Sequence, residues 1–223
     1  MLARTSSRTR LTAAVLAAPL LLAVSACTDT EEQTDETATT AVPTTMTSAA
    51  TTDDQGGGSP DATASVVDPS GADIGMAEFT DNDGVMQLSV EVSDLEPGFH
   101  GLHIHAIGTC EADSAAPDDP EDTGDFLSAG SHLNPDDSEH PDHAGDLPTL
   151  LVMEDGTATL TFHSDRLSMD ELNDEDGAAL IVHSTADNYA NIPERYAPDG
   201  PDADTTSAGD AGGRVAYGVI EAS

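Results

Sequence analysis

Short runs of alternating apolar and polar residues recur along the chain after about residue 60, and they constrain the fold more than any other feature. Alternation with a period of two places successive side chains on opposite faces of a β-strand. Turn residues separate the runs, as in DNDG at 81–84 and EDG at 154–156, which are typical of hairpins. The runs cover 64–67, 72–80, 85–93, 99–107, 149–153, 158–162, 178–183 and 214–220.

Eight short strands with little helix predict an all-β fold, an eight-stranded antiparallel β-barrel or sandwich. One helical turn is expected at 170–173. Aromatic residues are only 3% of the chain, so the core must be built from Val, Leu, Ile and Ala. Two stretches, 108–147 and 184–213, are long, polar and poor in strand pattern, and loops of that length are usually functional or disordered. The histidines cluster in and beside them, which favours two long functional loops.

The N-terminus reads as a targeting segment. A basic stretch precedes an apolar run at 11–24, which is too short for a membrane span and suits a signal peptide over residues 1–26. The sequence VSAC at 24–27 resembles a bacterial lipobox, which predicts that Cys27 is lipidated; the alternative is an ordinary cleavage site with an incidental cysteine. Residues 27–61 are rich in Thr, Asp and Gly and predict a disordered tether. The folded domain is expected at 62–223, outside the cytoplasm and held to the cell membrane by a lipid.

The charge is strongly acidic, with 43 Asp and Glu against six basic residues, all arginine. Removal of residues 1–26 would leave only Arg166, Arg195 and Arg214. Such a surface argues against nucleic acid as a partner, because phosphates require Lys and Arg. Solubility or adaptation to salt explains the acidity without reference to a reaction.

His103 and His105 lie two apart on an expected strand, so both side chains project to the same face. Leu102, Ile104 and Ala106 then face the core. Two adjacent imidazoles on a rigid strand form a partial copper site. An HxH pair alone is weak evidence for a metal.

A second group of candidate ligands falls within a loop rich in Gly, Pro and Asp. Its members are His132, His140, His143 and Asp146. Three neutral nitrogens and one carboxylate form a tetrahedral zinc set. The alternative is a solvated acidic loop with scattered histidines, which the density of ligand types in so short a loop disfavours. His183 ends the apolar strand at 179–182 and adds a further candidate ligand.

Five ordered motifs resemble the copper/zinc superoxide dismutase family. They are GFHGLHIH at 98–105, GSHLNP at 130–135, HAGDL at 143–147, VH at 182–183 with ADN at 186–188, and GGRVA at 212–216 with GVI at 218–220. FLSAG at 126–130 and NIPERY at 191–196 are most similar to the secreted actinobacterial lipoprotein branch. The resemblance covers about residues 62–221 and implies a Greek-key barrel.

The resemblance assigns roles to individual residues. It implies copper on His103, His105 and His183, with His132 bridging copper and zinc. His140, His143 and Asp146 would complete the zinc site. Asp187 would accept N–H bonds from one copper-ligand and one zinc-ligand histidine, and Arg214 would attract superoxide. His100 matches a structural histidine and His163 matches nothing, so we expect the latter at the surface.

The activity that the resemblance implies is conversion of superoxide to dioxygen and hydrogen peroxide by Cu(II)/Cu(I) cycling, with zinc supporting the bridging histidine. The alternative function is an extracytoplasmic lipoprotein that buffers or delivers copper or zinc. Such a protein would not need Arg214. A structural domain with degenerate sites conflicts with the complete ligand set. The sequence leaves monomer and homodimer equally open.

The chain departs from the family pattern at its disulfide. Cys110 stands at the first position, but Tyr217 stands where the second cysteine should follow Arg214-Val215-Ala216. We therefore expect Cys110 to be a free thiol and packing of Tyr217 to help hold the loop. The zinc loop is also short, with only Pro141 and Asp142 between His140 and His143.

Overall fold

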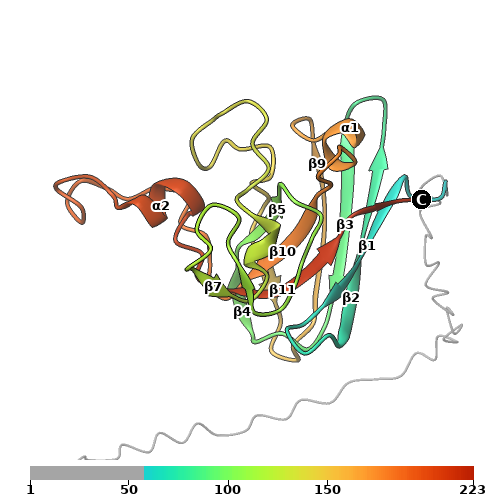
Figure 1. Cartoon of the computed structure of the whole chain (residues 1–223), viewed down its shortest axis with the longest axis horizontal. Helices are drawn as coiled ribbons and strands as arrows, with labels where there is room; N and C mark the ends of the chain where they lie inside the picture. The colour runs from blue at the N-terminus through green and yellow to red at the C-terminus, as the bar shows by residue number, and fades with distance from the viewer. Residues whose placement is uncertain (1–57) are drawn as a thin grey trace, which may run out of the picture. The chain divides into compact units, whose positions relative to one another are not determined.

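The structure is a computed structural model, and it describes residues 58–223. One antiparallel sheet curls through these residues in the order β5-β10-β11-β1-β2-β3-β9, with the short β12 beside β1 (Figure 1). The strands of this sheet are β1 Ala62–Val67, β2 Asp73–Asp81, β3 Met86–Val92, β5 Leu102–His105, β9 Ala158–Ser164, β10 Ala179–His183, β11 Arg214–Val219 and β12 Glu221–Ala222.

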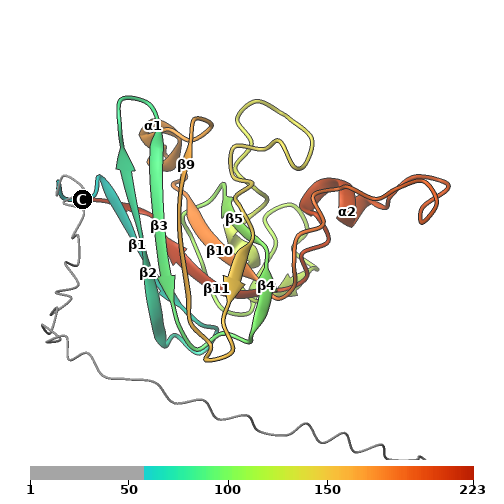
Figure 2. The same ribbon diagram turned by 180° about the vertical axis from the view of Figure 1, so that it is seen from behind.

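A second, two-stranded sheet joins the two ends of the first. Strand β4 (Gly98–His100) pairs with β8 (Leu150–Val152). Since β4 runs into β5 and β8 turns through a tight hairpin into β9, the pair closes the curled sheet toward a barrel (Figure 2). The neighbours β3–β9 and β5–β10 are far apart in sequence, as in a Greek key. The predicted all-β barrel or sandwich is confirmed.

The single strand expected at 99–107 is wrong, because Gly101 divides it into β4 and β5. The backbone N–H of Gly101 donates to the carbonyl of Thr185 (2.7 Å), outside both sheets. A Cβ at this position would lie 2.8 Å from the Cβ of Ala211, so the loop after β10 packs directly on the glycine. The apolar positions change phase across Gly101, from Phe99 to Leu102 and Ile104, and this short change is the only trace of the break in the sequence.

The helical turn expected at 170–173 is α1 (Met169–Leu172), and Ser168 and Glu171 form a capping box at its start. The two long loops contain more regular structure than their sequences indicate. The first holds the two-residue strands β6 (Ser114–Ala115) and β7 (Thr123–Gly124) and the 3₁₀ turn η1 (Leu127–Ala129). The second holds α2 (Ala203–Ala208), which projects beyond the barrel in Figure 1. Elements this short carry no readable periodicity.

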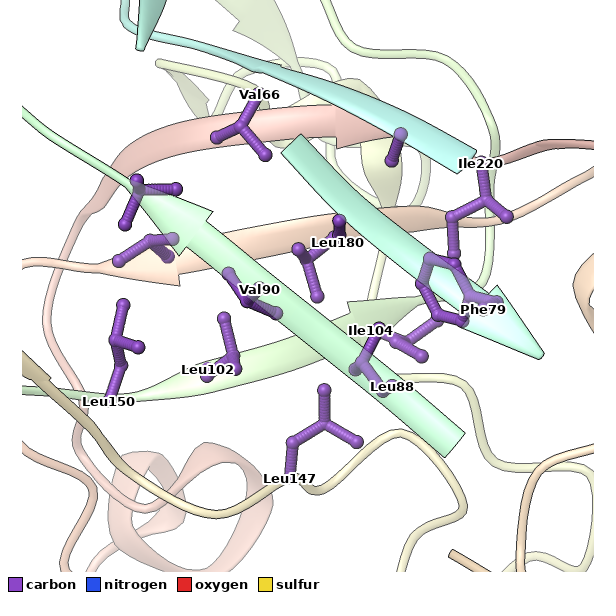
Figure 3. Packing of buried hydrophobic residues seen from close by; sticks show 14 of the residues in the cluster. Val66, Phe79, Leu88, Val90, Leu102, Ile104, Leu147, Leu150, Leu180 and Ile220 are labelled. Carbon is purple, nitrogen blue, oxygen red and sulfur yellow. The ribbon is translucent and has the colours of Figure 1, made fainter. Parts of the chain in front are cut away.

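The core lies inside the barrel and is built almost entirely from aliphatic side chains (Figure 3). Strand β2 alternates buried and exposed residues, because only one of its faces is covered. Strands β5 and β10 are buried on both faces. Leu102, Ile104 and Leu180 point into the core, while the other face of these strands lies under the two long loops. Side chains on that second face are therefore shielded from water without being part of the core.

No helix in residues 58–223 is long and apolar enough to cross a membrane. The signal peptide predicted for 1–26, the lipidation predicted at Cys27 and nearly all of the tether predicted for 27–61 lie outside the described residues. Strand β1 begins at Ala62, where the folded domain is expected to begin.

Candidate metal centre

Backbone pairing along the free edge of β5 brings the two groups of candidate ligands together. Residues 131–133 and 145–147 of the first long loop run beside this strand, through bonds such as Leu133 N–H to the carbonyl of Ile104 (2.7 Å). Isolated bridges place His103 opposite Asp146 and His105 opposite His132. The strand thus fixes the position of loop residues that are distant in sequence.

Gly145 permits this close approach. Its carbonyl accepts the N–H of Ile104 (2.9 Å) and its own N–H donates to Leu133 (2.9 Å). A Cβ on Gly145 would lie 2.2 Å from the carbonyl oxygen of Ile104, so no other residue fits without moving the loop.

Four buried imidazoles converge on one side of β5. They are His103, His105, His132 and His183, and one ring nitrogen from each lies within 4.8 Å of the others. Nδ1 of His105 lies 2.8 Å from the carbonyl of Gly130, and Nδ1 of His183 lies 3.1 Å from that of Gly212. Carbonyls only accept hydrogen bonds, so Nδ1 carries the proton in both rings and Nε2 keeps its lone pair. The two Nε2 atoms are 3.4 Å apart.

The other two rings also keep one nitrogen free. His103 uses Nε2 on Asp187 (2.9 Å), and His132 uses Nδ1 on Asp146 (2.7 Å). His103 Nδ1 and His132 Nε2 are buried without a hydrogen-bond partner. A buried polar atom left unpaired costs about 1–3 kcal/mol, so the orphaned nitrogens call for a further ligand. Four imidazole nitrogens with free lone pairs fit a copper ion.

The second group shares His132 with the first. Its members are His132, His140, His143 and Asp146, all buried. The carboxylate of Asp146 lies 2.7 Å from Nδ1 of His132 and 3.1 Å from Nδ1 of both His140 and His143. Nδ1 of His140 is close to the carboxylate but forms no hydrogen bond with it, because the two groups are not aligned. Ligand atoms on a tetrahedral zinc ion are about 3.3 Å apart, and the N₃O donor set fits that ion.

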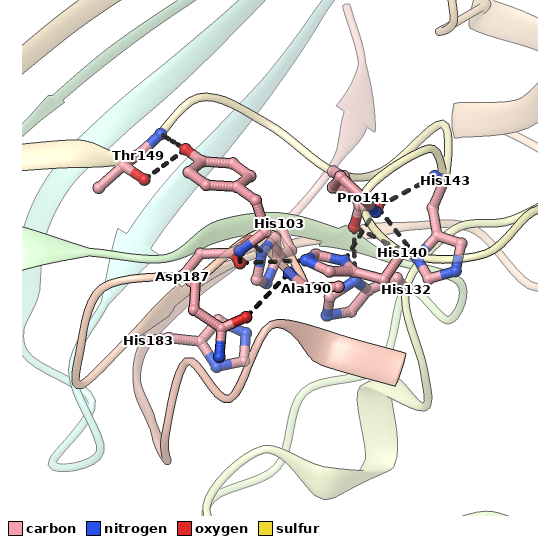
Figure 4. Close-up of polar contacts among 12 residues, drawn as sticks. His103, His132, His140, Pro141, His143, Thr149, His183, Asp187 and Ala190 are labelled. Carbon is pink, nitrogen blue, oxygen red and sulfur yellow. Dashed lines mark hydrogen bonds and ion pairs between the residues drawn. The ribbon is translucent and has the colours of Figure 1, made fainter. Parts of the chain in front are cut away.

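Asp187 links the two groups (Figure 4). Its Oδ2 lies 2.9 Å from His103 Nε2, and its Oδ1 lies 3.0 Å from His140 Nε2. The backbone N–H of Tyr189 also donates to Oδ1 (2.6 Å). Asp187 therefore orients one ring of each group. In each of these rings Nε2 is bonded to Asp187, so Nδ1 is the nitrogen left for a metal.

Three rings of the first group, those of His105, His132 and His183, favour the neutral form that metal binding requires. Burial, together with nearby Arg214, holds the pKa of His105 well below its ordinary value. Burial lowers the pKa of His132 to about 4 and that of His183 to about 3. His140 behaves differently: burial opposes protonation, but Asp146 and Asp187 outweigh it and raise its pKa to about 9. A positive charge is thus favoured between these two carboxylates.

A cavity of 670 Å³ opens onto the first group and is lined by His105, His132, His183 and Arg214. The guanidinium of Arg214 is half-buried there and donates to the carbonyls of Phe126 and Gly130. Within the described residues no carboxylate approaches it closely enough to form an ion pair. The cavity therefore combines imidazole rings with an unneutralised cation, which suits a small anion.

The remaining histidines lie outside both groups. His100 is buried with its ring nitrogens 2.6 Å from the carbonyl of His183 and 2.8 Å from that of Glu96. His163 is exposed on β9. Among the residues that contact the ligand groups, sequence reasoning missed Tyr189, through its backbone N–H, and Gly209, where a Cβ would lie 1.8 Å from Asp187. No motif marks either residue.

Comparisons with known proteins agree with this geometry. Residues 74–220 match the family model for copper/zinc superoxide dismutase. The chain is 42% identical over 172 residues to a Cu-Zn superoxide dismutase of Mycolicibacterium paratuberculosis, covering 74% of this chain and 75% of the relative. It is also 42% identical over 166 residues to the Cu-Zn superoxide dismutase of Mycobacterium tuberculosis, covering 71% of this chain and 69% of the relative.

Solved structures give the same fold. A Cu/Zn superoxide dismutase from Brucella abortus superimposes with a TM-score of 0.56 at 29% identity, covering 71% of this chain and 98% of the other. A SOD-like protein from Bacillus subtilis has a TM-score of 0.52 at 30% identity, covering 70% and 95%. Fold, ligand groups and relatives together define a metal-binding Greek-key barrel. The chain belongs to the copper/zinc superoxide dismutase family.

Proposed function

We propose that this protein is a superoxide dismutase that converts superoxide to dioxygen and hydrogen peroxide. The observation that carries the proposal is a cavity lined by three imidazoles of the first ligand group and by an arginine without a carboxylate partner among the described residues. A protein that only buffered or delivered metal would have no use for that arginine. The matching relatives bear the same activity in their names.

Copper would be held by His103, His105 and His183, with His132 as the shared residue. When bound, copper supplies a one-electron centre that accepts an electron from one superoxide and returns it to a second. The tautomers of His105 and His183 are set by backbone carbonyls, so their Nε2 atoms are ready to bind without proton movement. Both rings line the cavity.

Zinc would be held by His132, His140, His143 and Asp146. Zinc undergoes no redox change, so its contribution is structural and electrostatic. Nδ1 of His132 lies on the side of the ring beside Asp146 and would face zinc, which leaves Nε2 for the first group, in a ring that lines the cavity. His132 Nε2 is thus placed to carry the proton that the reduced product needs.

Arg214 would draw the substrate into the cavity. Superoxide carries one negative charge, and this guanidinium is the basic group among the lining residues that cannot lose its proton at neutral pH. Burial lowers the pKa of Arg214 from a very high ordinary value, and the group stays charged. Its charge acts at short range on an anion that has already entered.

Metal analysis of the purified full chain, combined with a superoxide consumption assay, tests the proposal. We expect one copper and one zinc per chain and activity that falls with copper removal. A protein that binds both metals at full occupancy yet does not consume superoxide would favour the metal-buffering function instead.

We further propose that the mature protein lies outside the cytoplasm and is anchored by a lipid on Cys27, as in the secreted actinobacterial branch. The support is the basic and apolar order of residues 1–24 followed by VSAC at 24–27. Mass spectrometry of the N-terminal peptide should find Cys27 acylated and residues 1–26 removed. Cys27→Ser should release the protein from the membrane fraction, whereas an unmodified Cys27 would contradict the proposal.

A further inference from the structure

Arg214 is positioned by the backbone of one short loop segment. Nη1 of Arg214 donates to the carbonyl of Phe126, and Nη2 donates to the carbonyl of Gly130 (2.6 Å). The carbonyl of Gly130 also accepts from Nδ1 of His105 (2.8 Å). Residues 126–130 therefore set the place of the guanidinium and of one proposed copper ligand at once. Anything that holds this segment also holds the cation in the cavity.

Phe126 is an unusual residue at the start of that segment. It is fully buried, yet its backbone is left-handed, with φ 62° and ψ 20°. Bulky residues are rarely found in this conformation, which persists only where the surroundings fix it. The carbonyl that accepts from Arg214 belongs to this left-handed residue, so its direction depends on what holds Phe126 in place.

The ring of Tyr217 packs on the ring of Phe126. Their centroids are 4.3 Å apart with an interplanar angle of 48°, a favourable tilted arrangement. The two rings belong to a small cluster, separate from the main core, that also contains Ala129, Ala179 and Ile181, with Cys110 at its edge. This cluster lies between β10–β11 and the first long loop.

A bulge in β11 allows two residues of this strand, Arg214 and Tyr217, to contact different parts of Phe126. Strand β10 pairs His183 with Arg214 and Val182 with Ala216, so one extra residue stands in β11. The extra residue shifts the alternation, and Arg214 and Tyr217 both face the loop. Val215 and Ala216 pack against the main core instead. Arg214 holds Phe126 by its carbonyl, and Tyr217 holds it by its ring.

We propose that Phe126 and Tyr217 are positioning residues for Arg214, and that their ring packing replaces the covalent tie which the chain lacks between Cys110 and position 217. The inference rests on the proposed role of Arg214 in binding the anionic substrate. Cys110 forms no disulfide within residues 58–223, so noncovalent packing is what joins the loop to β11 in this region. Loss of the ring at 217 frees Phe126, moves its carbonyl and lets the guanidinium swing.

The test compares Tyr217→Ala with Tyr217→Phe in the full-length chain. The heteronuclear ¹⁵N relaxation of the Arg214 side-chain Nε–H reports its order, and the signal is assigned by its loss in Arg214→Lys. The affinity of the copper-loaded protein for azide, followed optically, reports anion binding. We expect Tyr217→Ala to lower the order of Arg214 and to weaken azide binding about five-fold, with metal content unchanged. Tyr217→Phe keeps the ring and should match the wild type in both measurements.

Val90→Ala is the matched control, because it removes apolar volume from the main core away from Arg214. It should lower thermal stability and leave both readouts unchanged. If Tyr217→Ala fails to fold, Phe126→Leu tests the same packing with a smaller loss. Wild-type order and azide affinity in the ring-deleted variant would overturn the proposal, as would equal losses in Tyr217→Phe. The relaxation measurement decides the positioning role even if the protein does not consume superoxide.

Discussion

The hydroxyl of Tyr189 accepts the backbone N–H of Thr149 at 2.9 Å and also contacts the hydroxyl of that residue. Tyr189 lies two residues after Asp187 and donates its own N–H to that carboxylate. The side chain thus connects the loop that carries Asp187 to the end of the loop that carries the proposed zinc ligands. Asp187 in turn contacts a ring of each ligand group (Figure 4).

Tyr189→Phe should therefore loosen the zinc site without removing any proposed ligand. Losing a net hydrogen bond of about 1 kcal/mol corresponds to roughly five-fold faster zinc loss. The measurement is zinc release to a chromophoric chelator from the fully loaded protein. Tyr196→Phe is the control, since Tyr196 is exposed and distant in sequence from the ligands. Equal release rates for both variants would show that the contact to Thr149 does not hold Asp187.

The two ligand groups predict that two histidine variants lose different metals. His105→Ala should remove most copper and abolish activity, because its Nε2 faces the copper group and nothing nearby replaces it. His143→Ala should lose zinc and lower the melting temperature while leaving partial activity. His163→Ala, at an exposed position outside both groups, should leave both metals in place. Metal content with a melting curve measures all three, and wild-type activity in His105→Ala would refute copper binding on β5.

Gly209→Ala should damage the centre although glycine has no functional group. Gly209 has φ +63°, and a Cβ there would lie 1.8 Å from Oδ1 of Asp187 and 2.7 Å from Nε2 of His140. Displacing a carboxylate that orients metal ligands typically costs 10–100-fold in metal affinity. Competition with a chelator measures the loss. Gly213→Ala, which meets open space on the same loop, should retain wild-type affinity.

The sequence predicts most of the strands, because alternation records which faces are covered. It also names every proposed ligand, three on β5 and β10 and four in the first long loop. It does not locate the break at Gly101, because a short change of phase from Phe99 to Leu102 and Ile104 is its only trace. It also cannot indicate that Tyr189, Gly209 and Phe126 contact the site. Their contributions are a hydroxyl contact, a missing Cβ and a backbone carbonyl, which depend on three-dimensional placement and not on a residue pattern.

Cys110 should react slowly with alkylating agents, and its alkylation rate should show no plateau against pH in the neutral range. Burial raises the pKa of its thiol to about 12, against a smaller opposing effect of Arg214. The unfolded thiol has a pKa of about 8.5, so the contribution of this group to stability is complete below that pH and is lost as the pH rises toward 12. Iodoacetamide kinetics on a Cys27→Ser chain should show about ten-fold faster alkylation per pH unit from 7 to 10. A plateau near pH 9 would mean that the thiol is open to water.

The last prediction concerns salt. The cavity mouth carries the exposed acids Asp118, Asp122, Asp125 and Asp204 around a single arginine, Arg214. The whole chain has 43 acidic residues, so a superoxide anion approaches a surface that repels it. Attraction begins only inside the cavity. Salt screens exposed charges beyond roughly 8 Å at physiological ionic strength, and therefore weakens the long-range repulsion more than the contact with Arg214.

We expect kcat/KM to stay flat or rise as ionic strength increases from low to moderate, the opposite of an enzyme steered by a positive field. Asp122→Asn should raise kcat/KM about two-fold at low salt and have no effect at high salt, because only the unscreened repulsion is removed. Glu78→Gln removes the same charge from the exposed face of β2 and should change little. Arg214→Glu should cost at least about ten-fold at every salt concentration, because it reverses the charge inside the cavity. Pulse radiolysis across a salt series measures these rates. A steep, monotonic fall with salt in the wild type would show that a positive field reaches well beyond the cavity.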